Sequence, residues 1–202
     1  MATAYSVFAN DGFHIDPWLI SKVTEQKGKV LVDYKPAALD TATRVIDARN
    51  AFIMSSLLQE VTRAGTAARA KVALGRGDIY GKTGTTNDSM DAWFAGFHRT
   101  LTAVTWIGYD TPRKMGSNET GGGLSLPVWI SFMQHALKDV PVLEPAVPEG
   151  VMNSGGEWYY DEYAGGAGVS SLGLEDSTGL PGTGQPTPPA DEKKSILDLF
   201  RN

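Results

Sequence analysis

The ten residues 78–87, Asp-Ile-Tyr-Gly-Lys-Thr-Gly-Thr-Thr-Asn, constrain the fold more than any other stretch of the chain. Thr83, Thr85 and Thr86 are β-branched, and such residues favour extended backbone. Gly81 and Gly84 remove side chains from part of the segment, so that another backbone can approach it. The sequence therefore predicts a strand here.

Side chains on a strand alternate between its two faces, so Lys82 and Gly84 should point one way and Thr83 and Thr85 the other. Two hydroxyls then stand side by side near a lysine, and hydrogen bonds to charged groups are stronger than neutral ones. Gly84 would let a ligand backbone lie close, and an open strand edge can pair with an extended peptide. We expect a site for a carboxylate or another small anion.

Residues 81–83, Gly-Lys-Thr, also look like the end of a nucleotide-binding phosphate loop. That motif needs a glycine five positions before its second glycine, where this chain has Arg76, and Gly75 and Gly77 are each one place off. A helix should then follow the lysine, whereas residues 87–89 indicate a turn into an aromatic-rich strand. The spacing disfavours nucleotide binding. As a tripeptide, Lys-Thr-Gly is also compatible with a solvated hairpin tip.

The Lys-Thr-Gly tripeptide is one part of a longer pattern of four sequence blocks. These blocks occur in order and resemble the C-terminal half of the transpeptidase domain of class A penicillin-binding proteins, most like the 1A type. The blocks are Ala-Gly-Thr-Ala at 64–67, Gly-Lys-Thr-Gly-Thr-Thr-Asn-Asp at 81–88, Asp-Ala-Trp-Phe-Ala-Gly at 91–96 and Trp-Ile-Gly-Tyr-Asp at 106–110. The opening residues 1–10 also resemble that family. The resemblance covers roughly residues 1–140.

The resemblance implies an α/β (α+β) fold of the transpeptidase and β-lactamase type, with an antiparallel sheet flanked by helices. It implies an active-serine DD-transpeptidase that cross-links peptidoglycan stem peptides ending in D-Ala-D-Ala and is acylated by β-lactams. It also implies an upstream glycosyltransferase domain that polymerises a lipid-linked precursor. The expected location is the periplasmic face of the bacterial inner membrane, with the anchor upstream of Met1.

Three motifs build the active site of that family: Ser-x-x-Lys with the nucleophile and its lysine base, Ser-x-Asn, and Lys-Thr-Gly. No serine of this chain has lysine three places later or asparagine two places later. We therefore expect the nucleophile to lie upstream and the chain alone to be inactive. Two other interpretations stay open: a non-catalytic scaffold or binding fragment, and another active-serine hydrolase of the β-lactamase type.

The third motif supplies the site residues that the resemblance assigns to this chain. Lys82 would set the electrostatic potential and take part in a proton network, and the Thr83 and Thr85 hydroxyls would bind the substrate carboxylate. Gly84 would allow close approach, and the backbone N–H of Thr85 would be one of two oxyanion donors. The expected substrate-binding set is Lys82, Thr83, Gly84, Thr85, Thr86 and Asn87.

A hydrolase triad among Ser89, Asp88 and Asp91 is a weaker alternative. Asp and Ser favour turns through local side-chain to backbone hydrogen bonds, and no histidine lies close in sequence. We expect a turn here and give little weight to His98 as a partner.

Composition excludes several other classes of function. The chain has no cysteine, and His14, His98 and His135 show no ligand spacing, so we expect no metal site and no cofactor. A net charge of −5 without a basic stripe argues against nucleic acid. No apolar run reaches the roughly 18 residues that a membrane helix requires.

Charge and composition divide the chain near residue 141. Residues 1–141 carry 15 basic and 13 acidic side chains (+2), whereas residues 142–202 carry 3 and 10 (−7). The second segment has 10 Gly and 6 Pro among 61 residues, a proportion typical of disordered segments. We expect a transpeptidase part over 1–141 and a disordered acidic tail over 142–202. The aromatics at 157–163 and the terminal residues 190–202 are candidate contacts for a protein partner.

Periodicity predicts the remaining elements of the first part. We expect a helix at the start of the chain, a hairpin over 18–33, a helix from Asp47 to Arg63 with Asp47 as its N-cap, and a short helix over 66–70 capped by Thr66. The apolar stripe that should face the core from the second of these helices consists of Ile53, Met54, Leu57, Leu58 and Val61. Strands should follow over 91–97 and 101–108, giving an antiparallel meander with the strand that contains Lys82. A helix over 126–138 should pack across this sheet.

Overall fold

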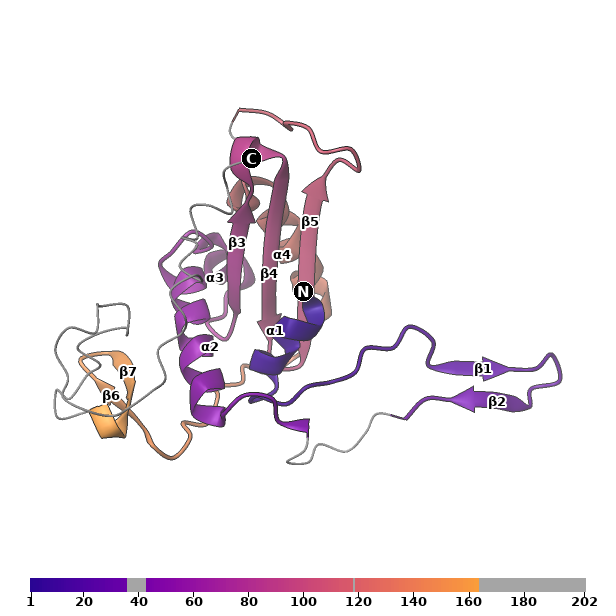
Figure 1. The fold of residues 1–202 in the computed structure, drawn as a ribbon, viewed down its shortest axis with the longest axis horizontal. Helices are drawn as coiled ribbons and strands as arrows, with labels where there is room; N and C mark the ends of the chain where they lie inside the picture. Colours follow the sequence, from indigo (N-terminus) through magenta and orange to yellow (C-terminus); the bar gives the residue numbers. More distant parts are fainter. Residues whose placement is uncertain (36–42, 118, 164–202) are drawn as a thin grey trace, which may run out of the picture. The chain divides into compact units, whose positions relative to one another are not determined.

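A three-stranded antiparallel sheet forms the centre of the fold (Figure 1). The computed structural model describes residues 1–35, 43–117 and 119–163. The strands are β3 (Tyr80–Thr85), β4 (Asp91–His98) and β5 (Leu101–Gly108), in the order β3-β4-β5. The meander predicted from the sequence is confirmed. The short helix η2 (Asn87–Ser89) joins β3 to β4, and Asp88 and Ser89 have positive φ there, in keeping with the predicted turn.

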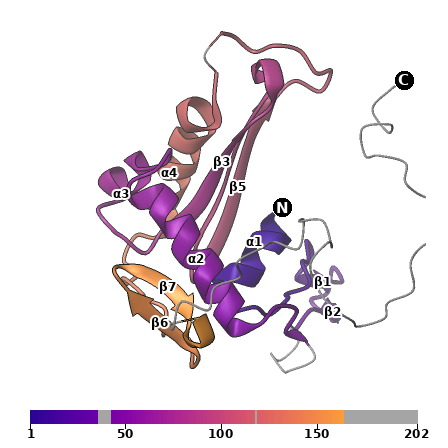
Figure 2. The same cartoon turned by 60° about the vertical axis from the view of Figure 1, so that its left-hand side comes forward.

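Helices lie on both faces of this sheet (Figure 2). The first, α1 (Ala2–Ala9), contacts β4 and β5 on one face. On the other face lie α3 (Arg69–Leu74) and α4 (Leu126–Ala136), and α4 follows the π-helical turn η3 (Gly121–Ser125). The fold is therefore a sheet between helices, as the sequence predicted.

The expected packing of the 126–138 helix across the sheet is confirmed. Its indole donor, Trp129 Nε1, lies 3.0 Å from the Ala103 carbonyl oxygen of β5, and its ring meets Phe94 edge to face at 4.8 Å. The largest apolar cluster forms here and contains Ala67, Ala70, Ile79, Phe94, Leu126, Trp129, Ile130, Met133 and Leu137. This cluster holds the start of β3 against the helices.

The helix α2 (Ala48–Arg63) begins as predicted, because the Asp47 side chain accepts a hydrogen bond from Arg49 N at 2.9 Å. The predicted apolar stripe was wrong in part, since Leu57 is 54% exposed. The buried residues are Ala51, Ser55, Leu58 and Thr62, of which only Leu58 belongs to the predicted stripe, and the other three are small or polar. Small side chains let α2 lie close to the start of β3, where Thr62 Oγ1 donates to Ile79 O.

The helix expected over 66–70 was misplaced. The structure has it at Arg69–Leu74, and its N-cap is Ala68 without a side-chain bond. Thr66 lies in the preceding turn, and its hydroxyl contacts the Thr83 hydroxyl of β3 instead of capping the helix. Gly75 ends the helix in the left-handed conformation (φ 65°), which glycine adopts without strain.

The first two-stranded ribbon confirms the predicted hairpin with narrower bounds, β1 (Lys22–Thr24) and β2 (Val30–Asp33). Its base is marked by Trp18 and Tyr34, whose rings stack at 4.3 Å. All residues of both strands are exposed. The ribbon thus adds no buried residue to the core.

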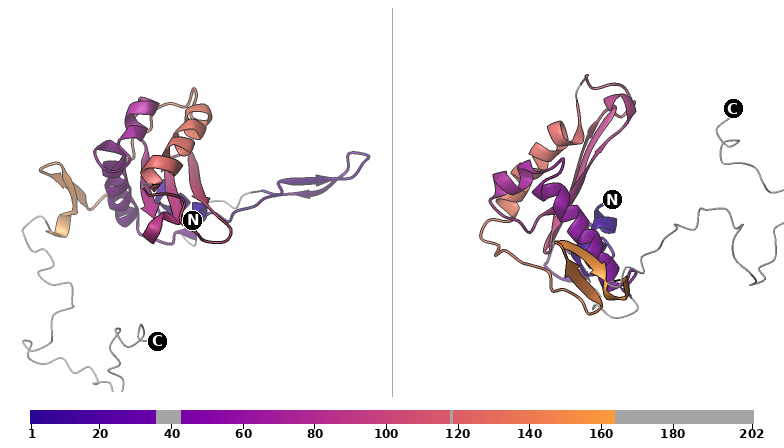
Figure 3. Two further views of the ribbon diagram at one scale, coloured as in Figure 1. Left: turned by 90° about the horizontal axis from the view of Figure 1, so that it is seen from above. Right: turned by 90° about the vertical axis from the view of Figure 1, so that its left-hand side faces the viewer.

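A second ribbon lies where a disordered segment was expected. Strands β6 (Val151–Ser154) and β7 (Glu157–Tyr160) pair, and the short helix η4 (Asp161–Tyr163) follows. The ribbon contacts α2, because Trp158 meets Phe52 edge to face at 5.0 Å, and Figure 3 shows it beside that helix. The prediction of disorder was wrong for residues 142–163, because composition alone does not reveal such aromatic contacts. The rest of the predicted tail, including 190–202, lies outside the described residues.

Candidate functional site

The predicted site strand, β3, is the end strand of the three-stranded sheet. Lys82 pairs with Ala95 of β4 and Thr85 with Ala92. Beyond the strand, Thr86 N donates to Asp91 O at 3.1 Å, toward β4. Backbone groups of consecutive residues on a strand point to alternate edges, so those of Thr83 and Thr85 point away from β4. An extended ligand could pair with that edge.

The Lys82 side chain is exposed and curls back along this edge. Its Nζ donates to the Thr83 carbonyl oxygen at 2.9 Å and lies 3.5 Å from Thr83 Oγ1. Within the described part of the chain, no carboxylate pairs with the Lys82 ammonium. The charge is therefore available to an anion.

The Thr83 hydroxyl joins Lys82 to a residue that sequence reasoning did not place in the site. Thr66 Oγ1 lies 2.9 Å from Thr83 Oγ1, and either oxygen can donate. Only one of the two hydroxyl hydrogens is used in this contact, so the other hydrogen can be donated to a ligand. Thr66 belongs to the Ala-Gly-Thr-Ala block at 64–67, which already pointed to the family. The two threonines are 17 positions apart, however, and no local pattern predicts their contact.

The Thr85 hydroxyl meets the turn η3. Thr85 Oγ1 accepts a hydrogen bond from Gly121 N at 3.1 Å, and its own hydrogen stays free to donate. Gly121 must be glycine, because an added Cβ would lie 2.5 Å from Gly84 O. This approach fixes the η3 turn against the site strand, and sequence reasoning did not foresee it.

The two glycines of β3 differ in how closely they pack on β4. A Cβ at Gly81 would lie 2.6 Å from the Phe94 ring and 2.8 Å from Ala95 O, closer than packed atoms allow. A Cβ at Gly84 would lie 3.2 Å from Trp93 Cβ, a tight contact that a shift of a few tenths of an ångström would relieve. Packing on β4 therefore requires glycine at position 81 and only favours it at position 84.

Thr86 and Asn87 lie beyond the strand and shape the turn. Thr86 Oγ1 accepts from Asp91 N at 2.8 Å, and Asn87 is exposed at the first position of η2. The structure thus gathers Lys82, Thr83 and Thr85 on one strand and separates Thr86 and Asn87 from them.

The hydrolase triad finds no support in the geometry. His98 stands at the far end of β4 from Asp91, and its ring nitrogens contact Asp78 at 3.1 Å and Thr100 at 2.9 Å. Asp91 Oδ1 accepts from the Trp106 indole at 2.8 Å. His98 and Asp91 therefore have structural partners other than Ser89.

A buried ion pair precedes the site strand. Arg76 donates two hydrogen bonds of 2.7 Å to Asp78, which also accepts from Leu143 N at 2.8 Å. Burial by itself would raise the pKa of the Asp78 carboxyl, but the Arg76 guanidinium and the Leu143 N–H hold that pKa below its ordinary value. Burial lowers the pKa of His98, and Asp78 offsets this in part. The network anchors the chain just before β3.

Two further features of the described ranges concern metal binding and membrane insertion. Residues 1–35, 43–117 and 119–163 hold no group of three or more His, Asp or Glu side chains placed to bind a metal ion. None of the helices described there has the length and apolar content to cross a membrane.

Comparisons with a family model and with curated relatives point to the same protein family. The family model described as the penicillin binding protein transpeptidase domain matches residues 1–133. Penicillin-binding protein 1A of Neisseria flavescens is 42% identical over 191 residues, which cover 94% of this chain and 23% of that protein. The Neisseria gonorrhoeae protein of the same name is 45% identical over 163 residues, covering 80% and 20%. The chain spans about a fifth of the length of the curated relatives it matches.

Solved structures agree with the sequence matches. Penicillin-Binding Protein 1A from Haemophilus influenzae superposes with a TM-score of 0.71 at 31% identity, covering 79% of this chain and 31% of that one. The D,D-transpeptidase domain of a peptidoglycan glycosyltransferase from Eggerthella lenta reaches a TM-score of 0.50 at 23% identity, covering 69% and 32%. The second match supports the fold alone.

Proposed function

The chain belongs to the penicillin-binding protein transpeptidase family, and on that premise we propose that it supplies the carboxylate-binding edge of a peptidoglycan DD-transpeptidase site. The observation that carries the proposal is the convergence of the Lys82 ammonium, which no carboxylate of the described residues pairs with, and threonine hydroxyls at the outer edge of β3. In this proposal the Thr83 and Thr85 hydroxyls bind the terminal carboxylate of the stem peptide. Lys82 contributes positive potential and a place in the proton network.

The backbone of Thr85 has a separate role in the proposal. Its N–H, directed to the outer edge of β3, would be one of two donors to the oxyanion that forms when the substrate carbonyl is attacked. Removing one such donor elsewhere costs about 10²-fold or more in rate. Gly84 would bring the substrate backbone close to this donor, with Thr86 and Asn87 closing the end of the binding segment.

The nucleophile is the part of the reaction that this chain does not carry. We assign the serine nucleophile, its lysine base and the Ser-x-Asn motif to sequence that the much longer relatives have beyond the matched span. The intact protein would then be a bifunctional glycosyltransferase and transpeptidase, acylated by β-lactams and anchored at the periplasmic face of the inner membrane. The chain by itself would be inactive.

A fluorescent penicillin tests the site in the full-length protein. Lys82→Ala should abolish covalent labelling, because it removes the cation that faces the bound carboxylate. Lys71→Ala on α3 is the matched control, since Lys71 is also exposed but lies away from the β3 edge, and it should label like wild type. Wild-type labelling of Lys82→Ala would remove the site assignment.

A non-catalytic scaffold is the second candidate, and the absence of a Ser-x-x-Lys sequence from the chain favours it for the chain taken alone. The same reagent separates the two candidates. Labelling of the 202-residue chain by itself would require a nucleophile that our proposal places elsewhere. Labelling of the full-length protein alone supports the transpeptidase.

A further inference from the structure

A small cavity lies beside the start of β3, away from the Lys82 edge. It measures about 90 Å³ and is partly open to solvent. Residues from α2, from β3 and from the segment 144–158 line it, namely Phe52, Ser56, Gln59, Tyr80, Glu144, Pro145, Val147 and Trp158. Residues 134–163, which supply half of this lining, lie outside the span of the family match.

One polar group in this lining is buried without a partner. Tyr80 is 1% exposed, its ring stacks on Phe97 at 4.9 Å, and its hydroxyl makes no hydrogen bond to any described residue. A buried hydroxyl without a partner is costly, so a group that fills the cavity and bonds to it would stabilise the site. Burial first, and then the nearby Glu144, raises the pKa of Tyr80 to about 12, so the phenol stays neutral.

The remaining polar groups of the lining offer mainly acceptors. The Ser56 hydroxyl donates its hydrogen to Ile53 O at 2.8 Å, and the Gln59 amide donates to Gly77 O at 2.9 Å. What they keep for the cavity is oxygen lone pairs and the second N–H of the Gln59 amide. Glu144, an exposed residue, is the one ionisable carboxylate among the lining residues. The lining contains no lysine or arginine, although the charge of Arg99 acts on the Tyr80 phenol from outside the lining.

Aromatic rings form part of the cavity wall. Phe52 and Trp158 meet edge to face at 5.0 Å, and both line the cavity. Ring faces attract cations, most strongly where water is displaced. A carboxylate, acceptor oxygens and aromatic walls in so small a space match a compact cation that carries several hydrogen-bond donors.

We propose that this cavity binds the ammonium group of a primary amine. The ammonium has three donors and no acceptor, so it can bond to Glu144, to the Tyr80 oxygen and to Ser56 while it lies against the Phe52 and Trp158 rings. An anion would meet Glu144 at close range, and an apolar group would leave the Tyr80 hydroxyl without a partner. The amine comes either from a free small molecule or from a lysine-like side chain of a peptide.

Calorimetric titration of the full-length protein tests the proposal with three probes: methylammonium, N-acetyl-lysine N-methylamide and the neutral isostere N-acetyl-norleucine N-methylamide. We expect both amines to bind and the norleucine compound to give no heat. A lysine compound that binds at least about tenfold tighter than methylammonium indicates a peptide side chain, and equal affinities indicate a free amine. No heat from either amine, as for a cavity that holds water alone, overturns the proposal.

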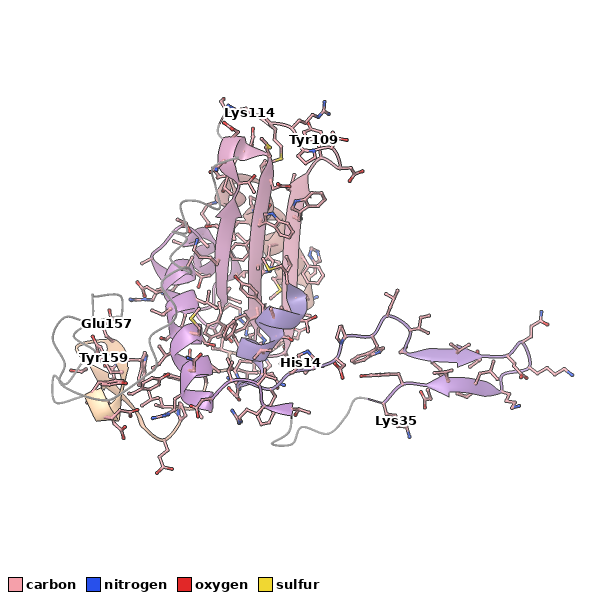
Figure 4. All side chains as sticks on the ribbon, in the orientation of Figure 1. His14, Lys35, Tyr109, Lys114, Glu157 and Tyr159 are labelled. Carbon is pink, nitrogen blue, oxygen red and sulfur yellow. The ribbon has the colours of Figure 1, made fainter. Side chains whose placement is uncertain are left out.

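Three variants tie the binding to this cavity. Glu144→Gln should weaken the amines about tenfold or more, and Tyr80→Phe should weaken them several-fold without loss of thermal stability, because no described residue bonds to the hydroxyl. Glu157→Gln is the matched control, since Glu157, labelled in Figure 4, is an exposed glutamate at the start of β7 and is not among the residues that line the cavity. Wild-type affinity in both Glu144→Gln and Tyr80→Phe overturns the proposal.

Discussion

The charged side chains at the two ends of strand β3 differ in burial and in pairing. Before the strand, Asp78 is fully buried, and each of its bonds goes to a fixed partner of the same chain. At the other end, Lys82 is exposed and no carboxylate of the described residues pairs with it. Burial with complete pairing indicates a charge that holds the fold together. Exposure with spare donors indicates a charge that awaits a ligand.

The largest effect should come from the buried end. Asp78→Asn removes the charge that pairs with Arg76 and leaves a buried cation uncompensated, which costs about 3–5 kcal/mol of unfolding free energy. Denaturant unfolding of the full-length protein measures this, with Asp110→Asn, an exposed aspartate, as the control. A loss no larger than that of the control would contradict the anchoring role of Asp78.

The exposed end should respond in binding more than in stability. Thr85→Val removes a hydroxyl that would donate to a charged carboxylate, a bond worth about 1.5–3 kcal/mol, or roughly a tenfold to hundredfold slower acylation by penicillin. The free energy of unfolding should fall by no more than the loss of the Gly121 N bond to Thr85 Oγ1 explains, about 0.5–1.5 kcal/mol. Thr105→Val on β5 makes the same chemical change in the same sheet and should leave acylation unchanged. Equal slowing in both variants would mean that sheet packing, and not carboxylate binding, limits the rate.

A smaller effect should follow from the hydroxyl next to Thr83. Thr66→Val removes a neutral hydrogen bond of about 0.5–1.5 kcal/mol and should slow acylation by a few-fold to about tenfold. A double-mutant cycle with Thr83→Val separates direct from shared contributions. If the two effects simply add, Thr66 does not act through Thr83, and its place in the site is lost.

The smallest effect should appear as a pH dependence at the buried end. Because the pKa of His98 is lowered in the folded protein, the unfolded chain takes up a proton first as the pH falls below about 6.5, and stability falls with it. The lowered pKa of Asp78 adds a further loss only below its ordinary value of 3.8. Melting temperatures from pH 8 to pH 5 should therefore decline more in wild type than in His98→Gln. Parallel curves would exclude His98 as the titrating group.

Local pattern predicted most of the sheet but only part of the site. The β-branched residues from Thr83 to Thr86 and the aromatic run after Asp91 indicated β3 and β4 correctly, since alternation and turn chemistry are local properties. The Thr66–Thr83 pair and the approach of Gly121 to Gly84 join residues 17 and 37 positions apart, and only the folded chain brings them together. Leu57 was misassigned to the core because the buried side of α2 is chosen by close packing on β3 and not by hydrophobicity alone.

The Leu143 contact with Asp78 affects how this protein should be shortened for laboratory work. The family match ends at residue 133, and a protein cut there would lack the amide that caps the Asp78 carboxylate and the indole that covers Phe52. Such a product would expose an aromatic ring and weaken the anchor of the strand that bears Lys82. A domain boundary chosen after residue 163 keeps both contacts.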